Sequence, residues 1–315
     1  MRPRSVKTFA PATISNIGPG FDVLGIAIDR PGDNVFARRR REPGVLLTVK
    51  TRYTNIPSDT RKNVAGHVAS LMLEDFKPPF GVDLVLYKRM PIGSGLGSSA
   101  ASGVASAVAV NALLPRPVSK LNLLPFVLEG ERFACGAPHA DNAAPSLFGG
   151  ACLIRSYNPL DVVSIPVVNS IVWVVVHPHL TVETRKARNV LPKTVPLRSA
   201  VHQWGNVGGL AVGLATGDAR LVGKCIDDVI IEPRRARLIP GFRAVKDAAL
   251  QAGALGCSIS GSGPSLFSVA SSPRAAKAIA VAMVTAFLRV ARVECDVYIS
   301  RINPHGARTV GIQNR

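Results

Sequence analysis

The feature that most constrains the fold is a glycine-rich turn between a strand pattern and an alanine-rich helix pattern. Val82, Leu84 and Leu86 alternate with less apolar residues over 81–90, as in a half-buried strand. The turn P-I-G-S-G-L-G-S-S-A-A follows at 91–101, and residues 98–114 are mainly Ala and other small residues that favour a closely packed helix. A strand, a glycine turn and a helix in this order present backbone N–H groups to an anion.

The glycines of this turn narrow the kind of anion site. Gly93, Gly95 and Gly97 allow positive φ and a close approach to a bulky polyanion, while Ser98 and Ser99 can cap the helix or turn a hydroxyl toward phosphate or Mg²⁺. The turn has no lysine, so it is not a Walker A P-loop, and it does not match the dinucleotide pattern G-x-G-x-x-G. The residues alone favour an anion site, with an ordinary turn before a capped helix as the alternative.

The rest of the chain interleaves strand and helix patterns without a regular βαβ period, which favours an α+β fold over a doubly wound parallel sheet. Strands are predicted over 7–12, 26–38, 45–53, 81–90, 151–154, 171–176, 258–270 and 293–302, with turns at Gly18-Pro19-Gly20 and Pro31-Gly32. Helices are predicted over 63–76, 98–114, 121–133, 197–216, 218–231, 242–252 and 273–290. A boundary near 155–170 predicts two domains, 1–160 and 161–315.

The composition is that of a globular protein, with 47% apolar and 18% charged residues. The longest apolar stretches, at 100–114 and 170–176, are shorter than the ~18 to 20 residues that a membrane span needs. The first residues are basic but lack a compact apolar segment with a small-residue cleavage site, so they do not resemble a signal peptide. We therefore expect a cytoplasmic protein with no membrane partner.

The cysteines and histidines do not predict a metal centre by themselves. The five cysteines include no C-x-x-C pair, which argues against both a disulfide framework and a four-thiolate site. His177 with His179, and Cys135 with His139, lack a recognised ligand spacing. We do not predict metal ligation by any of these four residues.

The net charge of +18 is compatible with a phosphate-bearing partner but does not identify it. The four arginines at 38–41 have no interleaved aromatic residues, which is more typical of a solvated strand end than of a nucleic-acid surface. Nucleic-acid binding is therefore an alternative that we do not expect.

Two segments resemble motifs of a known family, the GHMP kinases (galactokinase, homoserine kinase, mevalonate kinase and phosphomevalonate kinase). The turn at 91–101 matches the family signature P-x₃-G-L-G-S-S-A at every position. Residues 256–265, G-C-S-I-S-G-S-G-P-S, resemble its C-terminal glycine-rich loop, with Ser262 where many relatives have Ala. The resemblance implies a two-domain fold, with an N-terminal domain like domain 2 of ribosomal protein S5 and a ferredoxin-like C-terminal domain.

Four more segments resemble the homoserine kinase branch of this family. They are 10–22 (A-P-A-T-I-S-N-I-G-P-G-F-D), 139–150 (H-A-D-N-A-A-P-S-L-F-G-G), 187–192 (A-R-N-V-L-P) and 232–242 (E-P-R-R-A-R-L-I-P-G-F). Ala143 departs from the branch, which has Val there. The resemblance implies that ATP phosphorylates the side-chain hydroxyl of L-homoserine to give O-phospho-L-homoserine and ADP, in threonine biosynthesis.

The substrate roles follow from this resemblance and from the chemistry of a zwitterion with a primary hydroxyl. Arg188 and Arg235 would hold the carboxylate, and Asp22 would hold the ammonium group. Asn16 and Asn142 would make the remaining polar contacts. Taken singly, each has a structural alternative, such as a surface ion pair for the arginine before Leu-Pro and a turn for the asparagine in the Gly-Pro-rich segment.

The resemblance also implies the nucleotide, metal and catalytic residues. ATP would contact Asn63 through its base and the turn residues Pro91, Ile92, Gly93, Ser94, Gly95, Leu96, Gly97, Ser98, Ser99, Ala100 and Ala101 through its phosphates. Ser98 and Glu131 would hold Mg²⁺, although Glu131 on a predicted helix is by itself a solvated carboxylate. The catalytic residues would be Asn142, Asp141, Thr184 and Arg188, with Thr184 close to the transferring phosphate. The sequence leaves open whether Asp141 points inward or serves as a general base.

The resemblance also leaves one alternative function and suggests how the protein assembles. Another kinase of the family, acting on mevalonate, shikimate or a sugar, is the nearest alternative, and the arginine pair argues against a neutral sugar. Members of the family are often dimers, so a homodimer is also expected.

Overall fold

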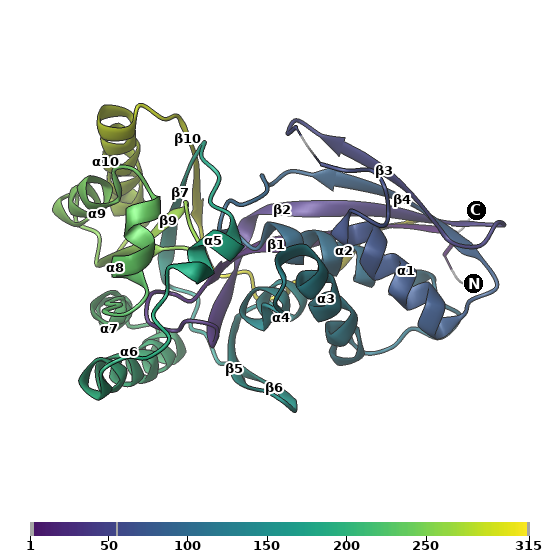
Figure 1. The fold of residues 1–315 in the computed structure, drawn as a ribbon, viewed down its shortest axis with the longest axis horizontal. Coiled ribbons are helices and arrows are strands. Elements are labelled where there is room, and N and C mark those ends of the chain that lie inside the picture. Colours follow the sequence, from purple (N-terminus) through teal and green to yellow (C-terminus); the bar gives the residue numbers. More distant parts are fainter. Residues whose placement is uncertain (1–2, 55, 314–315) are drawn as a thin grey trace.

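The computed structural model describes residues 3–54 and 56–313, and over these residues it contains two β-sheets (Figure 1). The seven-stranded sheet consists of β1 (Ser5–Ser15), β2 (Leu24–Arg40), β3 (Val45–Thr51), β4 (Gly81–Lys88), β5 (Ala151–Tyr157), β6 (Leu160–Ile165) and β11 (Arg308–Gln313). The four-stranded sheet consists of β7 (Val172–Pro178), β8 (Gly256–Ile259), β9 (Leu266–Ala270) and β10 (Cys295–Ser300). The predicted α+β class is confirmed.

The first sheet is mainly antiparallel, with the order β11-β1-β2-β4-β3, and β5 pairs with both β2 and β6. Four helices pack on it and on one another: α1 (Val64–Phe76), α2 (Ser98–Leu113), α3 (Lys120–Cys135) and α4 (Ala140–Phe148). The central helix α2 contacts α1, α3, α4 and the sheet, so it is buried on nearly every side. Because α2 is covered on nearly every side, its sequence lacks an amphipathic pattern. Its small residues let the neighbouring elements approach closely.

The second sheet has the order β10-β7-β9-β8 with antiparallel pairs, which is the ferredoxin-like order expected from the sequence. Helices α9 (Phe242–Gln251) and α10 (Pro273–Ala291) cover one face, and α6 (Leu197–Thr216) and α7 (Ala219–Cys225) cover the other. Val174 packs with the first pair of helices, whereas Trp173 and Val175 pack with the second. Because both faces are covered, β7 is a continuous apolar run rather than an alternating one.

Two predicted elements are wrong in their extent. Residues 258–270 form β8, a turn and β9 rather than one strand, because Gly261 and Gly263 adopt φ of +57° and +81° and reverse the chain. The predicted helix 218–231 stops at Cys225, and the carboxylate of Asp228 instead accepts backbone N–H bonds from residues 230–232. Such local side-chain bonds compete with the helical ladder.

Several elements lie outside the predictions. They are α4, β6, β11, α5 (Thr184–Asn189), α8 (Glu232–Arg235) and the 3-10 turn η1 (Ala236–Leu238). Strand β2 also continues through Pro31-Gly32, where a turn was predicted, and its pairing with β1 shifts register nearby. These elements are short or interrupted, so their periodicity is too weak to detect.

Candidate active site

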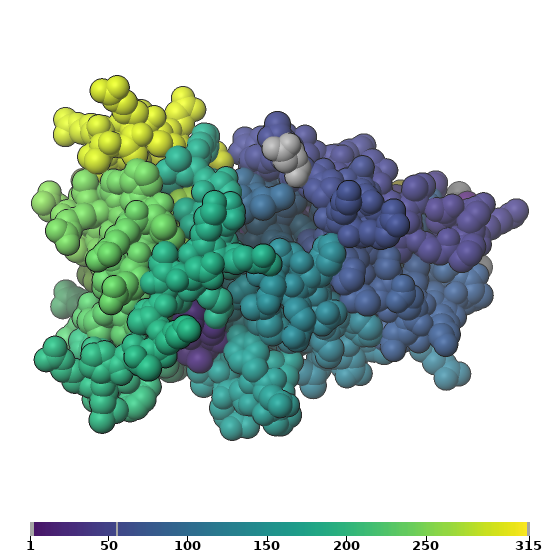
Figure 2. Space-filling view, viewed as in Figure 1, coloured from purple at the N-terminus to yellow at the C-terminus, as the bar shows by residue number. Residues whose placement is uncertain are grey.

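A cavity of about 480 Å³ lies where the two sheets and their helices meet. Its walls come from the turn after β1, the loop before α2, the C-terminal end of α3, helix α5 and the turn between β8 and β9. Figure 2 shows the surface where the two parts of the molecule meet: dark purple atoms from the N-terminal part of the chain lie there between green and teal segments. A cavity of this size suits a small-molecule ligand.

The glycine-rich turn forms one wall of the cavity. Gly93, Gly95 and Gly97 have φ of +67°, +76° and +63°, as their sequence pattern predicted. A methyl group at Gly97 would collide with the hydroxyl of Thr13 and lie 2.7 Å from Oδ1 of Asn142. The turn therefore packs directly on β1 and α4, and it leaves the N-terminus of the 16-residue helix α2 facing the cavity without a side-chain cap. This arrangement attracts anions.

The structure brings most, but not all, of the predicted nucleotide residues to the cavity. Those on its wall are Asn63, Ile92, Gly93, Ser94, Gly95, Gly97, Ser98 and Ser99. Pro91, Leu96, Ala100 and Ala101 are not on the wall, and the last three are fully buried in the packing beneath the turn. Asn63 caps α1 by accepting from the N–H of Ala65 at 3.0 Å.

Lys88 is a cavity residue that the sequence analysis missed. Its ammonium group pairs with Asp33, and it donates to the carbonyl of Ser98 at 2.7 Å and to the hydroxyl of Ser102 at 2.9 Å. Burial lowers the pKa of Lys88, against the pull of Asp33. Its position was visible in the sequence, because residues 82, 84, 86 and 88 alternate onto the buried face of β4. Lys88 therefore fixes the first turn of α2 through its hydrogen bonds from β4.

The second glycine-rich turn holds the first. The hydroxyl of Ser260 donates to the carbonyl of Gly95 at 2.7 Å, and that of Ser265 donates to the carbonyl of Ser94 at 2.6 Å. Ser265 also lies 3.1 Å from Nδ1 of His177, whose pKa burial lowers to about 4. A neutral imidazole from β7 thus stabilises the contact between the two turns.

Two arginines and one aspartate gather at the other end of the cavity. Arg188 donates to both carboxylate oxygens of Asp22 at 3.0 and 2.9 Å. Arg235 donates to the carbonyl of Gly261 at 2.7 Å, and burial lowers its pKa to about 10. Both guanidinium groups lie 5.1 Å from the ring centroid of Phe21, so the same aromatic ring contacts both cations. The predicted residues Asp22, Arg188 and Arg235 are brought together.

The two predicted asparagines are fixed by hydrogen bonds. Asn16 donates to the carbonyl of Gly261 at 3.0 Å and accepts from the N–H of Asp22 at 3.2 Å. Asn142 accepts from the hydroxyl of Thr13 at 2.6 Å and donates to that of Ser15 at 3.1 Å. The amides of both residues therefore have defined orientations at the cavity wall.

Asp141 points inward, which the sequence left open. It lines the cavity, is 2% exposed, and its Oδ1 has no hydrogen-bond partner among the described residues. Burial, and then the charge of Asp22, raises its pKa to about 7 despite the opposing charge of His139. A carboxyl group with this pKa changes charge near neutral pH.

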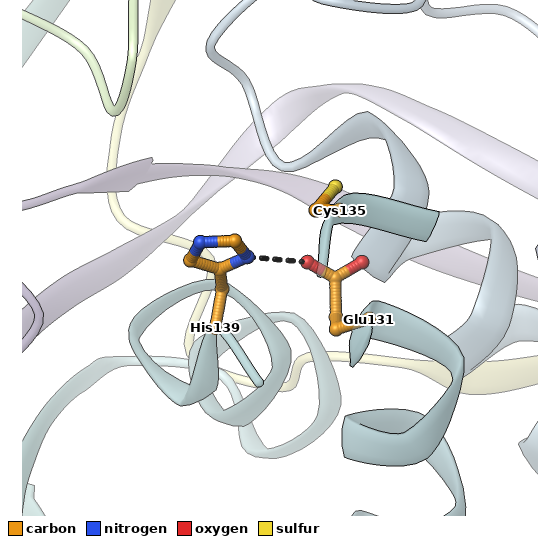
Figure 3. Close-up of side chains that lie close together, drawn as sticks. All are labelled: Glu131, Cys135 and His139. Atoms are coloured by element: carbon orange, nitrogen blue, oxygen red, sulfur yellow. Dashed lines mark ion pairs between the residues drawn. The ribbon is translucent and has the colours of Figure 1, made fainter. Parts of the chain in front are cut away.

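Glu131 is buried, so the expectation of a solvated carboxylate is wrong. It lies on the inner face of α3 with 2% exposure, and its Oε2 is 3.4 Å from Nδ1 of His139 (Figure 3). Burial acts to lower the pKa of His139, but contacts with Cys135 and Glu131 and the charge of Asp141 outweigh it and raise the pKa to about 10. Oε1 of Glu131 has no partner among the described residues and is available to a cation.

Thr184 and Arg188 both come from α5, the short helix that the sequence analysis did not predict. Because they are four residues apart, they lie on the same helical face and both line the cavity. The hydroxyl of Thr184 is 3.5 Å from that of Ser262 in the second glycine-rich turn. The i, i+4 spacing was a signal that could have revealed this helix.

Comparisons with known proteins match both parts of the chain. Residues 63–150 match the GHMP kinases N terminal domain, and residues 210–289 match the GHMP kinases C terminal domain. A homoserine kinase of Chlorobium phaeobacteroides (strain BS1) is 47% identical, covering 98% of this chain and 100% of its own length. A crystal structure of homoserine kinase from Cytophaga hutchinsonii is 49% identical with a TM-score of 0.93, covering 98% of each chain. A mevalonate kinase of L. major in complex with R-mevalonate shares the fold, with a TM-score of 0.74 and 18% identity over 95% of this chain and 96% of its own.

Proposed function

The chain belongs to the GHMP kinase family, and we propose that it is a homoserine kinase. The reaction transfers the γ-phosphoryl group of ATP to the side-chain hydroxyl of L-homoserine and gives O-phospho-L-homoserine and ADP. The product serves threonine biosynthesis. One observation carries this proposal: a single cavity joins an anion-binding helix N-terminus to a pair of guanidinium groups and a carboxylate.

The charged end of the cavity suits an amino acid. Arg235, which is 3% exposed, offers a buried guanidinium, and a carboxylate beside it would offset part of its desolvation. Asp22 would bind the ammonium group while Arg188 turns part of its fork to the carboxylate. The bidentate Asp22–Arg188 pair keeps both groups in place and mutually neutralised until the substrate enters.

The other end suits a nucleoside triphosphate and a magnesium ion. The first N–H groups of α2 and the backbone of the glycine-rich turn would bind the phosphates, and Asn63 would lie against the base. Ser98 and Glu131 fit a magnesium ion, because Oε1 of Glu131 is buried without a hydrogen-bond partner in the part of the chain that the structure describes. Hydroxyl and carboxylate oxygens are the ligands that magnesium prefers. Bound there, Mg²⁺ would neutralise charge on the phosphates.

The transfer itself needs positioning more than covalent chemistry. The fixed amide of Asn142 would orient the substrate hydroxyl, and Thr184 and Arg188 would lie beside the transferred group. We propose that no strong base is required: the hydroxyl oxygen bonds to phosphorus, the bond from phosphorus to the ADP oxygen breaks, and the hydroxyl proton passes to the phosphoryl oxygen. In this mechanism Asp141 affects the electrostatics of the cavity and does not accept the substrate proton.

One assay tests the proposal. ADP release from the purified chain is measured with homoserine, serine, threonine, shikimate and mevalonate at equal concentrations. We expect homoserine to give the highest kcat/KM by at least ~100-fold. Shikimate and mevalonate lack the amino-acid zwitterion, and serine and threonine carry their hydroxyl group closer to it. A preference for mevalonate or shikimate would assign the chain to another branch of the family.

The net charge of +18 raises the alternative of nucleic-acid binding. In the basic run, Arg38 pairs with Asp83 at 2.8 Å, Arg40 pairs with Glu42 at 3.2 Å, and Arg39 donates to a backbone carbonyl. These contacts support the sequence expectation of a strand surface. Polynucleotide affinity that falls steeply with salt, without homoserine-dependent ADP release, would favour the alternative.

The location and assembly of the protein remain proposals. Among the described residues no helix is long and apolar enough to cross a bilayer. From the similarity to homoserine kinases we propose a cytoplasmic enzyme. We also propose a homodimer in which α6 pairs with its copy. Leu197, Val201, Trp204 and Val212 form one exposed stripe on this helix, and Gly208 leaves open space beside Trp204.

The dimer proposal predicts the behaviour of a charge variant. Trp204→Glu places a carboxylate in the centre of the stripe, so we expect a twofold lower mass in sedimentation equilibrium with the fold unchanged. Val281→Glu, at a similarly exposed position on α10, is the matched control and should stay dimeric. A monomeric wild-type chain would contradict the proposal.

A further inference from the structure

Three side chains with different donor atoms converge beside the cavity. The ligand atoms of Glu131, Cys135 and His139 lie within 4.8 Å of one another (Figure 3). Glu131 and Cys135 are four residues apart on α3 and share one helical face. Gly136 ends that helix with φ of +81°, and the chain turns back so that His139 faces the pair. The cluster is therefore built by a helix end and not by flexible surface side chains.

The cluster contains unsatisfied binding capacity. Glu131 is 2% exposed and His139 is 8% exposed, yet Oε1 of Glu131 has no partner among the described residues. The contact between Oε2 of Glu131 and Nδ1 of His139 is 3.4 Å, which is longer than a good hydrogen bond. The Cys135 thiol, the His139 imidazolium and the buried Glu131 carboxylate thus face one another without closing a tight hydrogen-bond network, and a metal ion that binds them displaces the protons of the first two.

This donor set selects the kind of ion. Carboxylate, imidazole and thiolate together are the ligands of zinc, and three protein ligands leave a fourth position open. Magnesium takes oxygen ligands and has little affinity for a thiolate. A bound zinc ion would draw the three atoms about 1 Å closer, which the ends of the side chains can supply by rotation.

We propose that Glu131, Cys135 and His139 form a binding site for a borderline-soft divalent cation such as Zn²⁺, and that this cation inhibits the enzyme by withdrawing Glu131 from magnesium. The inhibition rests on the proposed kinase function and on the proposed role of Glu131. The binding itself does not, because it depends only on the three donors. Zinc and magnesium would therefore compete for the carboxylate of Glu131, zinc together with the nitrogen of His139 and the sulfur of Cys135, and magnesium in its proposed site with Ser98.

Cobalt absorption tests the binding without any activity measurement. The purified chain, freed of metal with a chelator and kept reduced with a phosphine, is titrated with Co²⁺. We expect visible bands of low-symmetry cobalt and a near-ultraviolet sulfur-to-cobalt charge-transfer band, both displaced by Zn²⁺. Cys135→Ser should remove the charge-transfer band and weaken Zn²⁺ binding by at least ~100-fold. Cys295→Ser, at the other partly buried cysteine, is the matched control and should keep both.

Two outcomes would overturn the proposal. One is a wild-type spectrum with only the weak bands of octahedral cobalt and no sulfur charge transfer. The other is a Cys135→Ser variant that keeps the wild-type spectrum and Zn²⁺ affinity. His139→Asn provides a second variant and should also weaken binding, so the conclusion does not depend on one substitution.

Zinc sensitivity tests the inhibition separately. ADP release is measured at saturating Mg²⁺ with increasing Zn²⁺, and each variant is compared with its own rate without zinc. We expect Cys135→Ser to need at least ~10-fold more Zn²⁺ for half inhibition, and a chelator to restore the wild-type rate. Equal sensitivity in both proteins would overturn the inhibition. Absence of any homoserine-dependent activity would remove the proposed function but leave the cobalt result intact.

Discussion

Asp141 is a residue whose charge state the tertiary structure changes. The pKa of a carboxyl in an unfolded chain is near 4, and burial and the charge of Asp22 raise that of Asp141 to about 7. Because the folded pKa is raised, Asp141 contributes stability in its protonated form, and this contribution is lost as the pH rises from about 4 to about 7.

Asp141→Asn should therefore stabilise the protein above neutral pH. The amide stays neutral, so the variant should gain of the order of 2 to 4 kcal/mol over the wild type at about pH 8 and less at about pH 5. Thermal melts at the two pH values measure the difference. Asp75→Asn, at an exposed position on α1, should show no such change. A gap that is independent of pH would contradict the raised pKa.

The same variant tests the proposal that no strong base is needed. Asp141→Asn should keep turnover within about tenfold of the wild type, because the substrate proton passes directly to the phosphoryl group. Steady-state kcat and homoserine KM are the readouts. Loss of turnover by ~1,000-fold with an unchanged KM would show that Asp141 is the base.

Arg188 illustrates why the shape of a cation matters at this site. Its two terminal nitrogens each donate to a different oxygen of Asp22, a pair of parallel bonds that the single nitrogen of an ammonium group does not offer. We expect Arg188→Lys to raise the homoserine KM by roughly 100-fold, with less than a threefold change in the ATP KM. Arg234→Lys is the matched control, since this exposed neighbour of Arg235 lies outside the cavity. Equal effects on both substrates would place Arg188 elsewhere in the mechanism.

At the scale of elements, the contact between the glycine-rich turn and β1 is the most demanding. Gly97 combines positive φ with two close side-chain oxygens, those of Thr13 and Asn142, so a side chain there must displace both. The hydroxyls of Ser260 and Ser265 also hold the turn, by donating to its carbonyl groups. Its backbone geometry is thus determined by two distant segments of the chain.

Gly97→Ala should separate collision from backbone strain. We expect at least a ~100-fold loss in kcat/KM for ATP, because the turn must move away from β1. Gly44 also has positive φ, at +86°, but open space around it. Gly44→Ala should therefore cost only about 1 kcal/mol of stability and leave kinetics unchanged. If Gly97→Ala leaves the kinetics as unchanged as Gly44→Ala does, the collision with Thr13 and Asn142 does not displace the turn.

At the scale of the whole molecule, the last strand connects the end of the chain to its beginning. β11 pairs with β1 from Ser5↔Gln313 to Phe9↔Arg308, and Ala307 before it is fully buried. We propose the domains 1–160 and 161–315. Two strands of the first sheet cross this boundary in sequence: β6 lies largely beyond residue 160, and β11 lies wholly beyond it. The first domain therefore depends on residues from the second half of the chain.

Ending the chain after Asn303 should destabilise it by about 2 to 4 kcal/mol, because β1 loses its outer partner and the packing of Ala307. Urea unfolding measures the change. The variant Ile312→Thr keeps β11 and alters only a side chain that is 60% exposed, so it should stay within about 0.5 kcal/mol of the wild type. An unchanged midpoint after truncation would show that β11 is dispensable.

Local sequence patterns determined the elements whose chemistry is local. The alternation in β4, the glycine turn and the small residues of α2 each follow from steric rules that act within a few residues, and all three were predicted. The length of α6 was also predicted at both ends. The residues of the cavity's charged end were identified by resemblance, and only their proximity required the structure.

Tertiary structure decided what depends on distant neighbours. The burial of Glu131 and Lys88, the inward position of Asp141 and the return of β11 to β1 arise from packing between segments that lie far apart in the sequence. Burial sets the pKa of a side chain, and contacts across the sheet select the partner of a strand. Neither quantity is contained in a local pattern, which is why the same residues that indicated the chemistry could not show the electrostatics that controls it.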